Sequence, residues 1–362
     1  ATTPVAPEVA AAMWPYLTEH FGNPSSASTQ GQVAKRAVDE AREKVAALIG
    51  ARPDEIVFTS GGTESNNLAI RGAAQKAAIR VAVTSAIEHP ATNAPLAHLR
   101  RRHGWAVEEL PVDREARIRL SQFPAGEIGL GTLILAHNET GTIQPMAAFA
   151  EAVHRGGGVV HADAAQAVGK IPVAVQDLGV DLLSIAGHKM YAPKGIGALY
   201  IRRGTDIAPV LLGAGQENGI RPGTENVASI VGLGAASELA GRLLAQEKTR
   251  QTSLREQLWD SLSTQLPGLV RISPRDGSLP NTLMVAVPGQ LGADILQVAN
   301  SLSASTGSAC HSGVHEPSAA LTAMGIDFDT ALGALRLSLG RGTSADDIEA
   351  AVRELKTAAG RA

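Results

Sequence analysis

The chain has 362 residues, 44% of them hydrophobic and 19% charged, and a formal net charge of −3. This composition is typical of a globular protein with one large core or two domains. The near-neutral charge gives no basic surface for nucleic acid, and no apolar run reaches the ~18 residues of a membrane span, so we expect neither partner.

No signal peptide is visible, and Cys310 is the only cysteine. An internal disulfide is therefore excluded, and a reducing, cytoplasmic location is expected. We expect no metal centre.

Strands and helices alternate in the first part of the chain. After a loop-rich start with a short apolar helix near 9–17, residues 31–49 predict an amphipathic helix closed by Gly50. Apolar runs bounded by turn residues predict strands at 55–59, 80–84, 106–110, 132–136, 159–162, 182–185 and 198–201, with helices near 91–101 and 146–154. This alternation predicts an α/β class with a mostly parallel sheet covered by helices on both faces.

The pattern changes after residue 226. A long helix over 227–265 precedes a smaller α+β segment with strands near 270–272 and 282–287, and the chain ends in an amphipathic helix over 344–358. We predict three parts: an N-terminal segment 1–12 that packs with the small domain, a large domain 13–235, and a small C-terminal domain 236–362.

Lys189 follows the predicted strand 182–185, in a Gly-His-Lys turn that leads to the next strand. Burial at a strand end lowers the pKa of an ammonium group toward the range where the free amine acts as a nucleophile and base. Lys189 is therefore a candidate Schiff-base lysine.

A second candidate site is the turn 60–63, Ser-Gly-Gly-Thr, which follows a strand and opens a helix. Free backbone N–H groups and the helix dipole there favour phosphate, and Thr63 adds a hydroxyl. An ordinary β–α turn is an equal alternative. Neither a Gly-x-x-x-x-Gly-Lys nor a Gly-x-Gly-x-x-Gly pattern is present, which disfavours nucleotide binding.

Polar residues follow three other predicted strands. Asp163 could hold the N–H of a pyridinium ring outside the carboxyl end of its strand, or it could be a helix N-cap. Asn138 could bond a ring substituent or shape a turn. His89 could stack on a planar ring or be an ordinary satisfied histidine.

Two residues of the C-terminal part carry further chemistry. Cys310 lies in a polar, Gly-containing segment, 305–318, which predicts a mobile loop. The adjacent His311 and His315 favour the thiolate, so a functional thiol is preferred to a buried small hydrophobe. Arg336 interrupts a strand-like apolar run, which indicates bidentate capture of a carboxylate or, equally, a structural ion pair.

Together these motifs resemble the cysteine desulfurases, NifS- and IscS-like, of the class V aminotransferase superfamily of fold-type I PLP (pyridoxal 5′-phosphate) enzymes. The matching runs lie at 1–4, 22–26, 59–66, 88–89, 138–141, 163–166, 187–189, 221–226, 307–310 and 336–338. The resemblance implies a mostly parallel sheet flanked by helices, with 13–235 binding PLP and a smaller α+β C-terminal domain carrying the cysteine.

The resemblance also implies a role for each matching residue. Lys189 would form the Schiff base with PLP, His89 would stack over the pyridine ring, and Asp163 would bind the ring nitrogen. Asn138 and Gln166 would surround the ring and its phenolic oxygen. The cofactor-binding set is completed, at the phosphate and around the lysine, by Gly62, Thr63, Ala186, Gly187, His188 and Thr224. Many relatives carry Ser at position 186 as a phosphate ligand, so Ala186 removes one hydrogen bond.

The implied reaction removes sulfur from L-cysteine to give L-alanine and a persulfide on Cys310, with Arg336 and Asn138 binding the substrate. Thr224 matches a phosphate contact that the family supplies from the partner subunit, which implies a homodimer with shared active sites. A protein sulfur acceptor such as an iron–sulfur scaffold is also implied. Three alternatives stay open: a selenocysteine lyase, an aminotransferase, and a non-catalytic sulfur carrier or partner-binding homologue.

Overall fold

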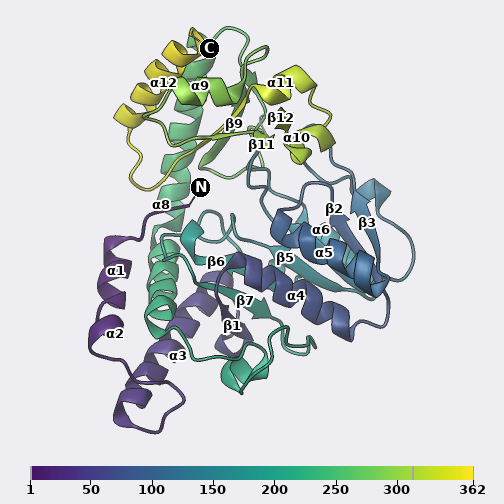
Figure 1. Ribbon diagram of the computed structural model, residues 1–362, viewed down its shortest axis with the longest axis vertical. Coiled ribbons are helices and arrows are strands. Elements are labelled where there is room, and N and C mark those ends of the chain that lie inside the picture. Colours follow the sequence, from purple (N-terminus) through teal and green to yellow (C-terminus); the bar gives the residue numbers. More distant parts are fainter. Residues whose placement is uncertain (1, 312–313, 362) are drawn as a thin grey trace. The chain divides into compact units, whose positions relative to one another are not determined.

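The computed structural model describes residues 2–311 and 314–361, with their side chains except those of 308–315. The chain divides into two compact units (Figure 1). Unit 1 comprises residues 1–110, 120–135 and 145–244, and unit 2 comprises 111–119, 136–144 and 245–362.

A seven-stranded sheet forms the centre of unit 1. Its strands are β1 (Ile56–Thr59), β2 (Val81–Ser85), β3 (Ala106–Leu110), β4 (Leu130–Ile134), β5 (Val159–Asp163), β6 (Leu182–Ala186) and β7 (Gly197–Ile201), in the order β1-β7-β6-β5-β4-β2-β3. Pairs from β3 to β6 are parallel, whereas β7 runs antiparallel to β6 and β1. The central strands β4 and β6 are buried at every position and consist mostly of apolar residues, as is usual in parallel sheets. The predicted α/β class is confirmed.

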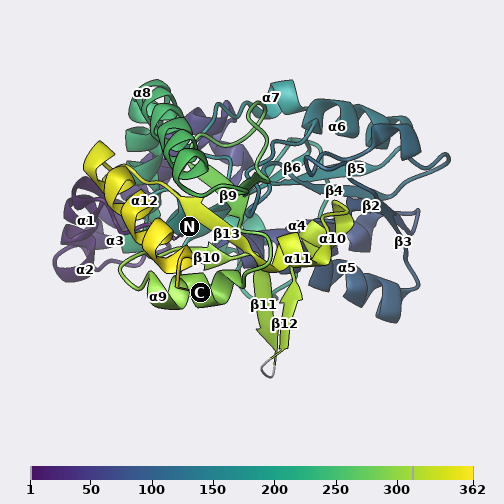
Figure 2. The same cartoon turned by 90° about the horizontal axis from the view of Figure 1, so that it is seen from above.

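Helices cover both faces of this sheet. Figure 2 shows α4 (Gly62–Lys76) and α5 (Pro90–His103) on one face and α6 (Met146–Arg155) and α7 (Val175–Leu178) on the other. The remaining helices of the unit are α1 (Pro7–Met13), α2 (Pro15–Thr18) and α3 (Thr29–Ile49), with 3₁₀ turns η1 (Pro53–Glu55), η2 (Leu120–Gln122), η3 (Gly187–Lys189) and η4 (Gln216–Gly219). Gly50 ends α3 in the left-handed conformation at φ 67°, as predicted.

Unit 2 contains a four-stranded antiparallel sheet, in the order β10-β13-β9-β8. Its strands are β8 (Val270–Arg271), β9 (Thr282–Ala286), β10 (Ser305–Thr306) and β13 (Ala334–Ser338), and its helices are α9 (Gly292–Val298), α10 (Ala319–Ala323), α11 (Phe328–Leu332) and α12 (Ala345–Ala359). Apolar side chains of β9, β13 and α12 form one core with the end of α8 (Val227–Gln265). This is the predicted smaller α+β part.

Two observed boundaries differ from the expected ones. The expected boundary at residue 235 lies inside α8, and the compact units divide at Leu244. The segment 1–12 was expected to pack with the small domain, whereas it belongs to unit 1 because its backbone is hydrogen-bonded there, for example from Ala6 N–H to the Tyr191 oxygen at 3.1 Å. One window of α8 has the length and hydropathy of a membrane span, but 56% of it is buried inside the protein, as in a core helix.

The segment around Cys310 also differs from its prediction. In place of a loop, β11 (Ser308–His311) and β12 (Val314–Pro317) pair as an antiparallel two-stranded ribbon (Figure 2). Composition favours a loop because small polar residues have low strand propensity, and the cross-strand backbone pairing that overrides it is not visible in composition.

Candidate active site

Lys189 lies on η3, directly after β6, and is half-buried. The turn is tight because a Cβ on Gly187 would lie 2.8 Å from Ile196 Cγ2, so only glycine fits where β6 turns toward β7. The Gly187 N–H donates to the Ile196 oxygen at 3.0 Å. The amine of Lys189 is thereby delivered to the carboxyl end of a central strand, where α/β sheets bind ligands.

The N-terminal segment fastens the lysine turn. Thr3 N–H donates to the His188 oxygen at 2.9 Å, and Thr3 Oγ1 accepts the Tyr191 N–H at 2.8 Å. Tyr191 has φ 68°, a left-handed conformation that a non-glycine residue holds only when its surroundings enforce it. Sequence analysis matched the Thr-Thr motif without assigning it this contact, because the bond joins residues 188 positions apart.

Asp163 ends β5 and is only 4% exposed. Its Oδ2 accepts from Asn66 Nδ2 at 2.7 Å, and its Oδ1 accepts from the Ala165 N–H at 3.0 Å. Two residues earlier, His161 lies between Thr132 and Ser184 hydroxyls, and burial lowers the pKa of His161 to about 4 despite the Asp163 charge. That imidazole is neutral at pH 7, and Asp163 makes no ion pair within the described part of the chain.

The Gly-Gly turn lies against the ends of two strands. Gly61 (φ 146°) is the N-cap of α4, whose first-turn N–H groups lack helical partners. A Cβ on Gly62 would lie 3.2 Å from Ala186 Cβ, at the end of β6, and a Cβ on Gly197 would lie 2.7 Å from Gly61 Cα. The turn, β6 and β7 therefore form a backbone cradle that larger residues would fill.

The segment 216–226 is tied to this turn. Glu64 accepts the Ser60 N–H at 2.6 Å and the Arg221 Nε–H at 2.8 Å. Burial alone would raise the pKa of the Glu64 carboxyl, but these hydrogen bonds and the Arg221 charge outweigh it and lower the pKa. A second, largely buried ion pair joins Arg42 to Glu217 at 2.7 Å. Thr224 lies in this segment with an exposed side chain.

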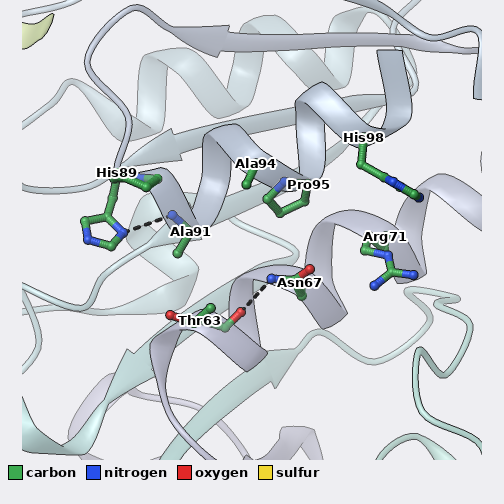
Figure 3. Close-up of a pocket in the computed structure, with 9 residues that line it drawn as sticks. Thr63, Asn67, Arg71, His89, Ala91, Ala94, Pro95 and His98 are labelled. Atoms are coloured by element: carbon green, nitrogen blue, oxygen red, sulfur yellow. Dashed lines mark hydrogen bonds between the residues drawn. The ribbon is translucent and has the colours of Figure 1, made fainter. Parts of the chain in front are cut away.

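His89 is the N-cap of α5, and its Nδ1 accepts the Ala91 N–H at 3.1 Å. That bond makes Nδ1 an acceptor, so the neutral ring carries its proton on Nε2. Figure 3 shows His89 and Thr63 among the side chains around a pocket of about 470 Å³ between α4 and α5. The structure thus brings these two predicted cofactor contacts to one pocket.

Two further predicted residues of unit 1 already have protein partners. Gln166 is buried, and its Oε1 accepts from Lys170 Nζ at 2.6 Å. His188 Nδ1 lies 3.1 Å from Thr2 Oγ1, and burial, followed by the charge of Lys189, lowers the pKa of His188. His188 therefore presents a neutral imidazole at neutral pH.

Asn138 and Arg336 meet within unit 2. Arg336 donates to the Asn138 backbone oxygen and to Ser305 Oγ, both at 3.0 Å, while its Nε is buried without a partner among the described residues. Burial lowers the pKa of Arg336, and Glu139 opposes the shift. The Glu139 charge acts on this guanidinium, so both readings considered above, carboxylate capture and a structural ion pair, stay predictions.

Cys310 lies on β11, where its backbone is in register with His315. Its side chain, with those of His311 and His315, lies outside the described side chains. The proposed activation of its thiol by these histidines therefore stays a prediction.

A lysine, a buried carboxylate and a Gly-Gly turn at one edge of a mostly parallel sheet are the arrangement typical of PLP-dependent α/β transferases. The chain belongs to the aminotransferase class-V family, whose model matches residues 1–351.

Curated relatives carry the assignment further. The chain is 42% identical to a cysteine desulfurase from Cereibacter sphaeroides, over 96% of this chain and 91% of the relative, and 40% identical to the cysteine desulfurase NifS of Azotobacter vinelandii, over 98% and 90%. A solved NifS-like protein superposes with a TM-score of 0.93 at 34% identity, covering 100% of this chain and 98% of its own. SspA in complex with cysteine superposes with a TM-score of 0.81 at 34% identity, over 93% and 96%. The predicted cysteine desulfurase activity is confirmed.

Proposed function

We propose that this cysteine desulfurase binds PLP in unit 1 and converts L-cysteine to L-alanine, leaving the sulfur as a persulfide on Cys310. The observation that supports it most is the placement of Lys189, Asp163 and the Gly61–Gly62 turn at one edge of the sheet, at the ends of β6, β5 and β1. Class-V aminotransferase and NifS-like folds are PLP-dependent, which supports the same cofactor here.

The residues present fit this cofactor. The backbone cradle around Gly62 is kept open by glycines and offers the N-terminus of α4 to a phosphate. Asp163 is a buried carboxylate with spare acceptor capacity and no cationic partner among the described residues, which suits a protonated ring nitrogen. Thr63 and His188 are the side chains we propose near the phosphate, and His89 the one on the ring face.

When bound, PLP supplies an electron sink for negative charge at the substrate α-carbon. Asp163 would hold the N–H of the ring nitrogen and so strengthen that sink. The Lys189 amine would take the substrate α-proton and return a proton later. Its position is set by η3 and by the Thr3 hydrogen bonds on either side of it.

Arg336 is proposed to bind the substrate carboxylate, because a partly buried guanidinium with a free Nε–H can still form a charge-assisted pair. The Cys310 thiolate then attacks the substrate sulfur. An S–S bond forms, the C–S bond breaks, its electron pair returns to the substrate carbon, and protonation gives L-alanine.

We further propose a homodimer, a protein acceptor for the persulfide sulfur, such as an iron–sulfur scaffold, and a cytoplasmic location. Thr224, exposed on a segment held by the Arg221–Glu64 pair, is the residue proposed to reach the partner subunit's phosphate site. Its resemblance to the family motif supports this role.

The visible spectrum tests the proposed function. Purified protein is expected to absorb as a PLP–lysine adduct, and the band should shift on adding L-cysteine but not L-lactate, which lacks an amine. A colourless protein that also gains no band from added PLP would contradict the proposal. Turnover of selenocysteine beside cysteine, at matched concentrations, separates the lyase alternative.

The Ala186 position yields a separate prediction. Ala186→Ser places a hydroxyl beside Gly62, where a phosphate oxygen is proposed, so PLP is expected to bind about tenfold more tightly, the effect of one hydrogen bond to a charged group. PLP release by dialysis, followed by fluorescence, measures it. Ala192→Ser, at another buried alanine of unit 1, is the control and should leave the affinity unchanged or weaken it.

A further inference from the structure

The structure contains a buried carboxyl group to which the proposed reaction gives no task. Glu88 lies between β2 and α5, immediately before His89, and is only 6% exposed. Its side chain is hydrogen-bonded to Ser85 at the end of β2 and to the Ile134 N–H at the end of β4. The cross-strand partner of Ile134 is Asp163, so Glu88 and Asp163 occupy the same edge of the sheet.

The hydrogen bonds of Glu88 are asymmetric. Its Oε1 accepts from Ser85 Oγ at 2.5 Å and from the Ile134 N–H at 3.0 Å, whereas its buried Oε2 has no partner among the described residues. Both donors are neutral, and no cation pairs with Glu88 there. An ionised carboxylate buried in this way would leave one oxygen unsatisfied and its charge uncompensated, which is costly.

Asp163 shows the opposite pattern. Each of its oxygens accepts a hydrogen bond, from Asn66 and from the Ala165 N–H. Two carboxyls at one strand edge do not both ionise readily, since the like charges repel. The donors decide which of them keeps the charge: Asp163 is ionised, and Glu88 holds the proton on Oε2.

We propose that Glu88 is a positioning residue held in its neutral form, which leaves Asp163 as the charged member of the carboxyl pair at the ends of β4 and β5. Its Oε1 joins the end of β4 to the turn before α5, where Asn93 Nδ2 also donates to the Glu88 backbone oxygen at 3.0 Å. The peptide that presents His89 is thereby fixed by the same side chain. The effect of Glu88 on the cofactor rests on the proposed role of Asp163, whereas the protonation state of Glu88 does not depend on that role.

Electrostatics agree with this geometry. Burial first, and the Asp163 charge in addition, raise the pKa of Glu88 to about 8, although the Ser85 and Ile134 bonds oppose the shift. The other titratable groups near this edge are Asp163, His161, His89, His137 and Lys189. Of these, only the Asp163 charge shifts the pKa of Glu88, and His161 is neutral. Above pH of about 8, a second negative charge would therefore appear beside Asp163.

The sign of the pH effect follows from the raised pKa. Between pH of about 4.5 and about 8 the unfolded chain releases the Glu88 proton while the folded chain keeps it, so rising pH favours unfolding. Glu88→Gln, a neutral isostere, removes this dependence. The variant's apoenzyme should gain several degrees of Tm over wild type as pH rises to about 8, and the gain should then level off.

Glu55→Gln is the matched control. Glu55 is also 6% exposed in unit 1, but both of its oxygens accept backbone N–H groups, from Arg52 and Arg203. This control should lose stability without any gain as pH rises. Parallel Tm curves for wild type and Glu88→Gln would overturn the proposal, since a purely structural Glu88 gives a pH-independent difference.

Infrared spectra of wild-type apoenzyme carrying ¹³C-labelled glutamate decide the matter even if the variant fails to fold. A buried protonated carboxyl band is expected at pH 6.5 and should vanish above pH of about 8. Its absence at pH 6.5 would overturn the proposal. In the holoenzyme, the alkaline loss of kcat should move upward by about one pH unit in Glu88→Gln. If the infrared band shows that Glu88 is protonated but the alkaline limb of the kcat profile does not move, only the proposed link between Glu88 and Asp163 is refuted.

Discussion

Cys310→Ser is expected to abolish sulfur transfer while PLP stays bound. The reaction needs a nucleophile for the substrate sulfur, and a serine hydroxyl is protonated at neutral pH and is a far weaker one than a thiolate. Alanine formation from L-cysteine should fall by about 10³-fold or more, because the C–S bond breaks only as the S–S bond forms. Alanine and sulfide assays measure the loss.

The control for this variant is the spectrum. Since Cys310 is the chain's only cysteine, no other thiol can take over, and an unchanged L-cysteine-induced band shift shows that the substrate still reaches PLP. Undiminished sulfide release from Cys310→Ser would remove the assigned role. Loss of the band as well would place the defect in folding or cofactor binding.

Lys189→Ala is expected to lose both covalent attachment of PLP and the base for the α-proton. The loss of a positioned general base costs about 10²–10⁴-fold in rate, and loss of the covalent bond should let PLP dissociate on dialysis. Steady-state alanine formation and PLP retention are the two measurements.

Lys194→Ala is the matched control, because Lys194 lies in the same β6–β7 connection with an exposed side chain. It should keep both activity and PLP. Lys189→Arg should be as inactive as the alanine variant, since a guanidinium stays protonated and can serve as neither base nor Schiff-base amine. Near-normal turnover by Lys189→Ala would contradict the assignment.

Local patterns predicted the elements of the fold well where one pattern dominates. The strand at 106–110 and the helix at 227–265 have the predicted limits. β4 lies at 130–134, two residues before its predicted position, because the apolar run extends past both ends of the paired segment. The strands β11 and β12, at 308–311 and 314–317, were predicted to be part of a loop, since their pairing is not visible in local composition.

Motif order proposed a set of residues around the lysine, but it gave no indication of the contacts that hold them. Thr3 and Glu88 act on the site through hydrogen bonds to Tyr191 and Ile134, residues distant in sequence. A threonine near a terminus and a glutamate before a histidine carry no local signal of such contacts. The burial of Glu88 among strand ends becomes visible only when the sheet order places β2 beside β4.

The most direct test of the central claim is a single turnover of the PLP-loaded enzyme with L-cysteine, analysed by peptide mass spectrometry and alanine quantification. The account predicts one added sulfur atom on the Cys310 peptide for each L-alanine formed, and no such addition in Lys189→Ala. Alanine formed without sulfur on Cys310, or pyruvate formed in its place, would contradict it.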